Sequence, residues 1–131
     1  MVTTTLTVDI PRGLWMTSND RLHWAAKAKR TKAIRTLAKH AARVAQIEAL
    51  HHVHVTVHVG YPTRTTADPG NAYPVIKAAI DGFTDAGLWP DDDSTHLTGP
   101  DPRREPHPTG RTGLHTLRFV FAATDQPGDH S

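Results

Sequence analysis

The sequence predicts a single α+β domain, in which a small, mainly antiparallel mixed sheet packs against one long and one shorter helix. Three segments alternate apolar and polar residues, as strands with one buried face do: 3–10, 51–61 and 114–123. Two other segments repeat apolar residues at helical spacing: 24–49 and 74–86. Together these patterns predict helices that cover one face of a sheet.

The length and composition of the chain limit the functions that it can have. The 131 residues suffice for one ordinary domain, which we place at 1–123, with a flexible polar tail at 124–131. The absence of Cys excludes disulfides, thiolate metal sites and a Cys nucleophile. No apolar run approaches the ~20 residues of a membrane span, and the first residues lack the blocks of a signal peptide. We therefore expect a cytoplasmic protein without membrane contact.

The first strand, 3–10, is followed by "PRG" and then by "TSND" at 17–20. These polar residues are typical of a turn or a helix N-cap. Asn19 is expected to cap the long helix, with a position facing the site as the alternative. Trp15 and Trp24 flank this segment. We expect both to pack inside the protein or at a dimer contact, with stacking on an unpaired base as the alternative.

The long helix, 24–49, has an apolar side and a basic side. The apolar residues are Ile34, Leu37, Ala38, Ala41, Val44 and Ala45. The basic residues are Lys32, Arg35, Lys39 and Arg43. Because no acid stands between Arg21 and Gln46, this side suits the phosphate backbone of a nucleic acid, although an ordinary solvated helix face is the simpler interpretation.

The second strand, 51–61, has Val on its buried face and His52, His54 and His58 on the other. Neighbouring side chains on one strand face diverge, and a ligating His usually needs a further partner. We therefore expect a partly exposed polar face here and no metal site.

The shorter helix, 74–86, begins with Pro74 and ends before Gly87, which are favoured residues at those two positions. After it the sequence predicts a short strand at 95–99 and a mobile loop at 100–113, which precede the last strand.

Acidic residues stand at both ends of the shorter helix: Asp68 before it and "PDDD" at 90–93 after it. Adjacent carboxylates repel one another, so fold stability gives no reason to gather them, whereas a divalent cation does. Lys77 and Asp81 share an outer face, which alone would be an ordinary salt bridge. With Mg²⁺ the natural chemistry is phosphodiester hydrolysis. The helix spans ~20 Å, so the two acidic groups meet only if the flanking loops turn to the same side.

An ordered set of residues resembles the central motif of the RusA family of Holliday-junction resolvases. The set is Asp68, Asn71, Lys77, Asp81, Gly87, Trp89, Asp91 and Asp92. "TSND" before a basic segment is similar to the opening of that family, and the similarity covers roughly 5–122. The resemblance implies a RusA-like fold in a small homodimeric endonuclease of phage, prophage or bacterial host, which cuts four-way branched DNA with Mg²⁺ or Mn²⁺.

The resemblance also implies roles for single residues. Asp68 and Asp92 resemble the metal-binding residues, with Asp91 beside them, and Lys77 resembles the Lys that assists at the phosphate. Asp81 resembles a helix Asp that orients Lys77. These roles make Asp68, Lys77, Asp81 and Asp92 the expected catalytic residues. The expected nucleic-acid-binding residues are Lys32, Arg35, Lys39, Arg43, Arg64, Arg103 and Arg104.

Two departures from the motif open an alternative. Gly70 stands where the motif has a second Asp, and the spacing between Asn71 and Lys77 is longer than usual. Since one carboxylate fewer weakens a metal site, the alternative is a junction-binding or DNA-binding dimer that cuts slowly or not at all. A third hypothesis is a small interaction domain, which would bind DNA weakly and with little dependence on salt.

Overall fold

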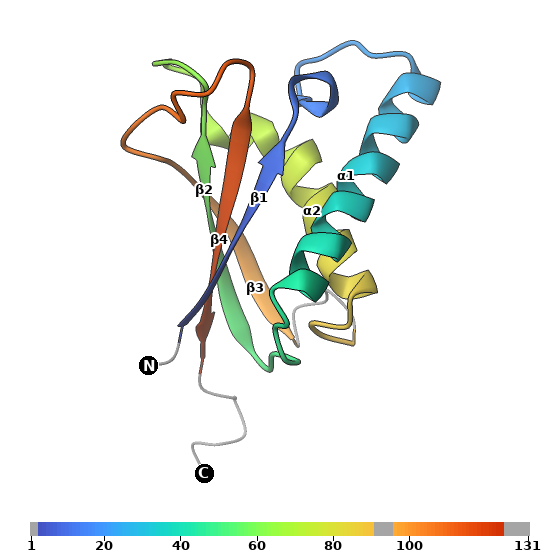
Figure 1. Ribbon diagram of the computed structural model, residues 1–131, viewed down its shortest axis with the longest axis vertical. Helices are drawn as coiled ribbons and strands as arrows, with labels where there is room; N and C mark the ends of the chain where they lie inside the picture. The colour runs from blue at the N-terminus through green and yellow to red at the C-terminus, as the bar shows by residue number, and fades with distance from the viewer. Residues whose placement is uncertain (1–2, 91–95, 125–131) are drawn as a thin grey trace.

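The computed structural model describes residues 3–90 and 96–124, and in this part of the chain one four-stranded sheet carries two helices (Figure 1). The strands are β1 (Thr3–Ile10), β2 (Val53–Gly60), β3 (Leu97–Arg104) and β4 (His115–Ala123). The helices are α1 (Trp24–Val44) and α2 (Tyr73–Asp85), with short 3₁₀ turns η1 (Arg12–Leu14) and η2 (Pro69–Ala72). No helix among the described residues is long and apolar enough to cross a bilayer.

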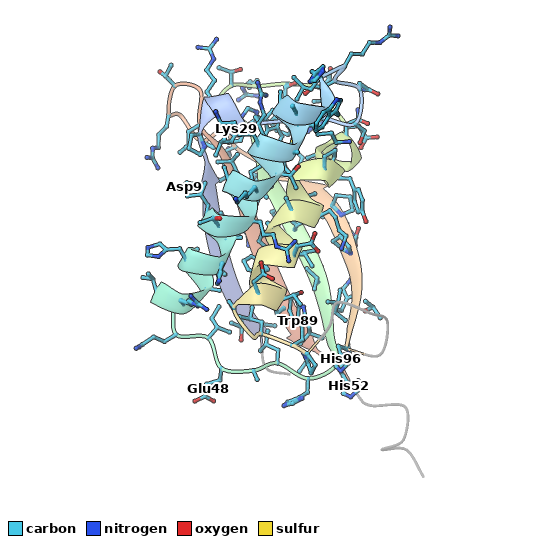
Figure 2. All side chains as sticks on the ribbon, turned by 90° about the vertical axis from the view of Figure 1, so that its right-hand side faces the viewer. Asp9, Lys29, Glu48, His52, Trp89 and His96 are labelled. Carbon is cyan, nitrogen blue, oxygen red and sulfur yellow. The ribbon has the colours of Figure 1, made fainter. Side chains whose placement is uncertain are left out.

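The strands lie in the order β1-β4-β2-β3. β4 pairs antiparallel with β1 and with β2, while β3 runs parallel to β2 at the edge of the sheet. Both helices lie on the same face of the sheet, so the molecule has two layers (Figures 1 and 2). The predicted α+β fold with a mainly antiparallel mixed sheet is confirmed.

The core lies between the sheet and the helices and follows the predicted alternation. Leu6, Val8 and Ile10 of β1 are buried, as are the four Val residues of β2. Phe83 of α2 meets Phe119 edge-on at a centroid distance of 4.8 Å, and Trp89 closes this aromatic cluster. The indole N–H of Trp89 donates to the Thr84 hydroxyl at 2.7 Å, which satisfies its polar atom inside the core.

Helix α1 starts at Trp24 as predicted, but its capping residue and its end differ from the prediction. The helix ends at Val44, and Gln46 has a φ of 54°, so the left-handed backbone there stops the helix before residue 49. Val44 is 67% exposed, so the expectation that it faces the core was wrong. At the other end the cap is His23, whose Nδ1 accepts from the Ala25 N–H at 3.2 Å, and not Asn19.

Helix α2 ends as its sequence predicted. Gly87 has a φ of 87°, its N–H donates to the Thr84 carbonyl, and the Leu88 N–H donates to the Phe83 carbonyl. These two bonds satisfy carbonyls at the helix end and turn the chain back to the sheet, where the side chain of Leu88 is buried.

Strand β3 is longer than predicted. The strand continues to Arg104, so residues 100–104, which were expected to begin a mobile loop, belong to the sheet. Pro100 and Pro102 caused the error, because proline is unfavourable inside a sheet. Both lie on an edge strand, where a missing N–H is tolerated.

The two helices run side by side and approach closely at Gly82. A Cβ at this position would lie 2.3 Å from the Arg35 carbonyl oxygen and 2.9 Å from the Ala38 Cβ. The guanidinium of Arg35 also donates twice to Asp85, at 2.5 and 2.8 Å. The close packing at Gly82 fixes α2 against α1 and thereby sets the position of the side chains on the outer face of α2.

Candidate functional site

Asp68 lies in a loop that is held from two sides. Its own carboxylate accepts from the Gly70 N–H at 2.9 Å and caps η2, the turn that leads into α2. Arg104 of β3 donates to the Ala67 carbonyl at 2.7 Å, and the Ser18 N–H donates to the Asn71 carbonyl at 2.9 Å. The polar "TSND" segment thus braces the Asp68 loop, a role that its sequence did not reveal.

Lys77 and Asp81 lie one turn apart on the outer face of α2. The Lys77 ammonium donates to Asp81 Oδ1 at 2.8 Å, with side chains 45% and 29% exposed. A pair so exposed adds little stability. The pair instead orients the Lys77 side chain, because Asp81 limits its rotamers and holds its charge in the first half of α2. The predicted contact between these two residues is confirmed.

The other predicted metal ligands, Asp91 and Asp92, lie outside the described residues. The residues on either side of them lie far from Asp68. Leu50, just before β2, donates to the Leu88 carbonyl at 2.7 Å, and Val53 donates to the His96 carbonyl at 3.0 Å. Figure 2 shows Trp89, His96 and His52 at one end of the molecule. Asp68 follows the other end of β2, so the whole of α2 separates it from Leu88.

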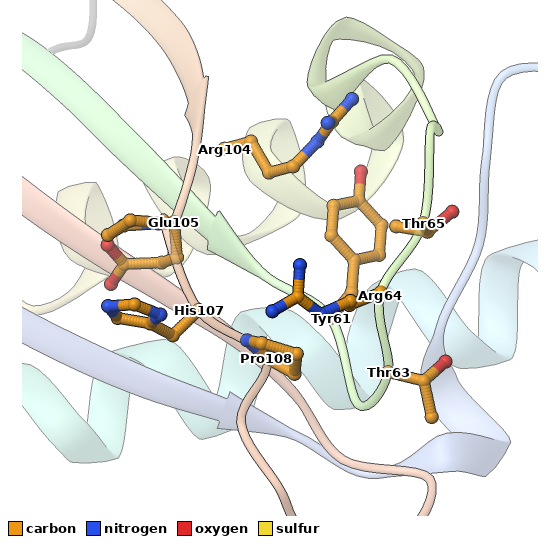
Figure 3. A pocket seen from close by; sticks show the side chains of 9 residues that line it. Tyr61, Thr63, Arg64, Thr65, Arg104, Glu105, His107 and Pro108 are labelled. Carbon is orange, nitrogen blue, oxygen red and sulfur yellow. The ribbon is translucent and has the colours of Figure 1, made fainter.

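A pocket of about 160 Å³ lies beside the Asp68 loop, at the ends of β2 and β3 (Figure 3). Arg64, Arg104 and the ring of Tyr61 line it, together with Thr63, Thr65 and residues 105–108. Burial raises the pKa of Tyr61, so its hydroxyl stays protonated near neutral pH and can donate a hydrogen bond. The negative charge of Asp68 raises the same pKa, and the bond from Arg104 to the Ala67 carbonyl holds the Asp68 loop beside the pocket.

The acid of this pocket is neutralised by a base outside it. Glu105 accepts two hydrogen bonds from Arg118, at 2.8 and 2.9 Å, and these bonds hold the pKa of Glu105 below its usual value. With Glu105 paired, the two guanidinium groups of Arg64 and Arg104 give the pocket a positive field. Such a field, with hydroxyl donors around it, favours an anion such as a phosphate.

The predicted nucleic-acid-binding residues lie in three places. Lys32, Lys39 and Arg43 lie on α1 with Arg35, whose charge is shared with Asp85. Arg64 and Arg104 lie at the pocket. Arg103 pairs with Asp101 at 2.8 Å on the sheet face that the helices leave open, and consecutive strand residues point to opposite faces. Arg103 therefore lies apart from the other predicted residues.

The same open face carries His54 and His58, both half-buried. His54 Nδ1 lies 2.9 Å from the Thr98 hydroxyl. Within residues 3–90 and 96–124, no group of three or more His, Asp or Glu side chains is arranged to hold a metal ion. The proposed ligands at 91 and 92 are outside these ranges.

The chain was compared with protein-family models and with curated proteins. Neither comparison finds a match. The assignment of a function therefore depends on the residues and their geometry.

His115, at the start of β4, is a site that sequence reasoning missed. Its ring stacks on Trp15 with centroids 3.8 Å apart, and Tyr61 approaches it edge-on at 5.5 Å. Its Nδ1 is buried and has no hydrogen-bond partner among the described residues. Burial lowers the pKa of His115 to about 4. A His within an alternating strand gave no signal of this stacking, because Trp15 is distant in sequence.

We expect His115 to make the protein sensitive to acid. Its pKa is about 4 when folded and 6.5 when exposed, so the unfolded chain binds the proton first as pH falls. The neutral His115 ring therefore makes its full contribution to the free energy of unfolding above pH 6.5. This contribution is lost progressively as the pH falls from 6.5 to about 4. The loss should be about 1–3 kcal/mol, given partial exposure of the ring. Urea unfolding of the wild type and of His115→Phe between pH 4 and 7.5 measures it.

The wild type should lose more stability than His115→Phe over that range. Equal slopes for the two proteins would show that other groups cause the acid sensitivity.

Proposed function

We propose that this protein is a Mg²⁺-dependent endonuclease that acts on branched DNA, with four-way junctions as its substrate. The observation that carries the proposal is the arrangement at the N-terminal end of α2. There Arg104 of the pocket binds the Ala67 carbonyl in the loop of the exposed Asp68 carboxylate. The Lys77–Asp81 pair lies on the outer face of α2, the helix into which this loop leads. This arrangement combines a metal-ligating group, an anion pocket and a cation, which phosphodiester hydrolysis requires.

Each group has a distinct role in the proposal. Arg64, Arg104 and the Tyr61 hydroxyl hold a backbone phosphate, and the bases of α1 extend the grip along the strand. Lys77 stabilises the negative charge that develops on the phosphate during cleavage. Asp81 does not touch the substrate, and it acts as a positioning residue for Lys77.

The residues fit a hard divalent ion at Asp68. Its carboxylate is exposed, and its Oδ1 accepts one backbone bond from Gly70. A Cβ at position 70 would lie 3.3 Å from that oxygen, so a carboxylate there would stand next to that of Asp68. Asp68 and Asp92, with Asp91 beside it, would hold the ion. When bound, Mg²⁺ supplies a Lewis acid and lowers the pKa of a coordinated water.

The positions of the flanking residues favour a homodimer. Pro90 is the last described residue before the proposed ligands at 91 and 92, and it follows the C-terminal end of α2. Asp68 precedes the N-terminal end, and the 13 residues of α2 span ~20 Å between the two ends. In a dimer with antiparallel α2 helices, Asp68 would share the ion with Asp92 of the partner subunit. Such a pair has two equivalent sites, which suits paired cuts on opposing strands.

A DNA-binding dimer with weak or no cleavage is the second candidate, and Gly70 favours it. In this position the chain has no second carboxylate, so the ion would have one ligand fewer. The basic side of α1 and the Arg64–Arg104 pocket would then serve binding alone.

One experiment separates the two candidates. A synthetic four-way junction and a linear duplex of the same sequence are incubated with the wild type, Asp68→Asn and Gly70→Asp, in Mg²⁺ or Mn²⁺. We expect the wild type to cut only the junction and Asp68→Asn to cut neither. Gly70→Asp should need less Mg²⁺, by roughly 10- to 100-fold, because it adds a carboxylate beside Asp68.

The backbone at Gly70 allows this change, since no positive φ is found there. Cleavage that persists in Asp68→Asn would show that Asp68 is not a metal ligand of the catalytic site. If the junction is bound tightly and left intact by the wild type, the non-cutting alternative holds.

A further inference from the structure

Trp24, the first residue of α1, is the most exposed large apolar residue in the described part of the chain. Its exposed fraction is 76%, whereas Trp89 is 2% exposed and Trp15 stacks on His115. Of the roles expected for Trp24, packing in the core is therefore wrong, whereas a dimer contact and stacking on an unpaired base stay predictions. His23 lies beside its ring at 5.5 Å, tilted by 33°, and leaves the indole open to a ligand.

The ring stands at one end of a shallow groove of about 430 Å³ on α1. The groove is lined by Trp24, Lys27, Ala28, Thr31, Lys32 and Arg35. Three of these six side chains are basic and none is acidic. Among the described residues no carboxylate pairs with Lys27 or Lys32, while Arg35 is shared with Asp85. The groove is thus an apolar ring followed by a line of positive charge.

This combination specifies its ligand. An indole face binds a flat aromatic ring, and the lysines bind negative charge beside it, which together describe a nucleotide. Along the helix axis Lys27 lies ~4.5 Å and Lys32 ~12 Å from Trp24, so the charges follow the ring in one direction, as phosphates follow a base. In a duplex both faces of a base are covered by its neighbours. Away from the ends of a duplex, the ring can therefore stack only on an unpaired base.

We propose that the groove formed by Trp24, Lys27 and Lys32 binds unpaired nucleotides of a DNA strand, with one base stacked on the indole. The inference deepens the proposed function, since bases at the centre of an opened junction lack a stacking partner. The binding itself needs neither Asp68 nor a metal ion. It can accordingly be measured apart from cleavage.

The test uses the full chain in EDTA, a labelled single-stranded oligothymidylate and a duplex of equal length. Fluorescence anisotropy gives the affinity, and tryptophan emission reports the ring, because Trp89 is buried and Trp24 is exposed. We expect the oligonucleotide to quench the emission. Trp24→Ala should weaken single-strand binding roughly 5- to 150-fold, while Trp24→Phe should keep most of it.

Two further variants sharpen the result. Val44→Ala removes another exposed apolar side chain of α1, outside the groove, and should leave the affinity unchanged. Lys32→Gln should reduce the slope of log affinity against log salt by about 0.7, the value for one phosphate contact on a single strand.

Several outcomes would overturn the inference. The inference fails if Trp24→Ala binds the oligonucleotide as the wild type does, or if it loses duplex and single-strand affinity equally. Trp24 emission that changes with protein concentration in the absence of DNA would show that a second copy covers the ring. Cleavage of a junction without Trp24-dependent binding would reject this inference and leave the proposed function intact. Trp24-dependent binding without cleavage in any metal would reject the proposed function and leave this inference intact.

Discussion

Replacing Lys77 by Met is expected to lower the rate of junction cleavage by about 10²–10³-fold, while leaving junction affinity within a few-fold of the wild type. The ammonium is held by Asp81 at 2.8 Å on the outer face of α2. In the proposed function it stabilises the charge that develops on the phosphate. Such a group contributes more in the transition state than in the bound complex. Single-turnover cleavage with saturating enzyme measures the rate, and a gel-shift assay in Ca²⁺ measures the affinity.

Asp85→Asn is the matched control for this variant. Asp85 lies on the same helix, half-exposed, and its pKa is lowered chiefly by hydrogen bonds from Arg35. Its loss leaves the positive charge of Arg35 in place, so we expect a cleavage rate close to that of the wild type. Should Lys77→Met and Asp85→Asn cleave equally fast, Lys77 has no role in the chemistry.

Gly82→Ala is expected to destabilise the protein by about 2–3 kcal/mol, even though Ala is favoured over Gly by ~1 kcal/mol inside a helix. The added methyl group would lie 2.3 Å from the Arg35 carbonyl oxygen and 3.0 Å from the Lys39 nitrogen. Both are backbone atoms of α1, so the two helices must separate. The midpoint of urea unfolding, followed by circular dichroism, measures this loss.

Gly13→Ala provides the comparison, because a Cβ at Gly13 has nothing within 4 Å in the structure. Its midpoint should stay within the error of the wild type. A Gly82→Ala protein as stable as Gly13→Ala would mean that α1 and α2 are not held at the close distance described above.

Much of the fold follows from short-range patterns. Alternation predicted β1, β2 and β4 because each has one face in the core, and the predicted boundaries of β1 match the structure. The end of α1 was missed because it depends on the left-handed Gln46 and on the bond between Leu50 and Leu88, and neither has a local signal. Strand β3 was shortened because its pairing with β2 comes from tertiary structure and overrides its prolines.

The candidate site was predictable in part. Spacing of four residues predicted the Lys77–Asp81 pair. The bracing of the Asp68 loop by Arg104 and Ser18 joins residues 37 and 53 positions apart, and such contacts appear only when the chain is folded. The pocket at Arg64 and Arg104 is likewise made by the ends of two strands that are adjacent only in the sheet.

The prolines of β3 have a consequence for how this protein can associate. The Glu105 N–H donates inward to the Val59 carbonyl, so by alternation the backbone nitrogen of residue 102 points away from β2. That residue is Pro102 and has no hydrogen to donate. A strand from another molecule that paired with this edge of the sheet would lack one backbone hydrogen-bond donor, at Pro102. Pro102 therefore disfavours strand addition and fibril-like stacking at β3. The β1 edge, the helices and the open sheet face remain for contact with other molecules.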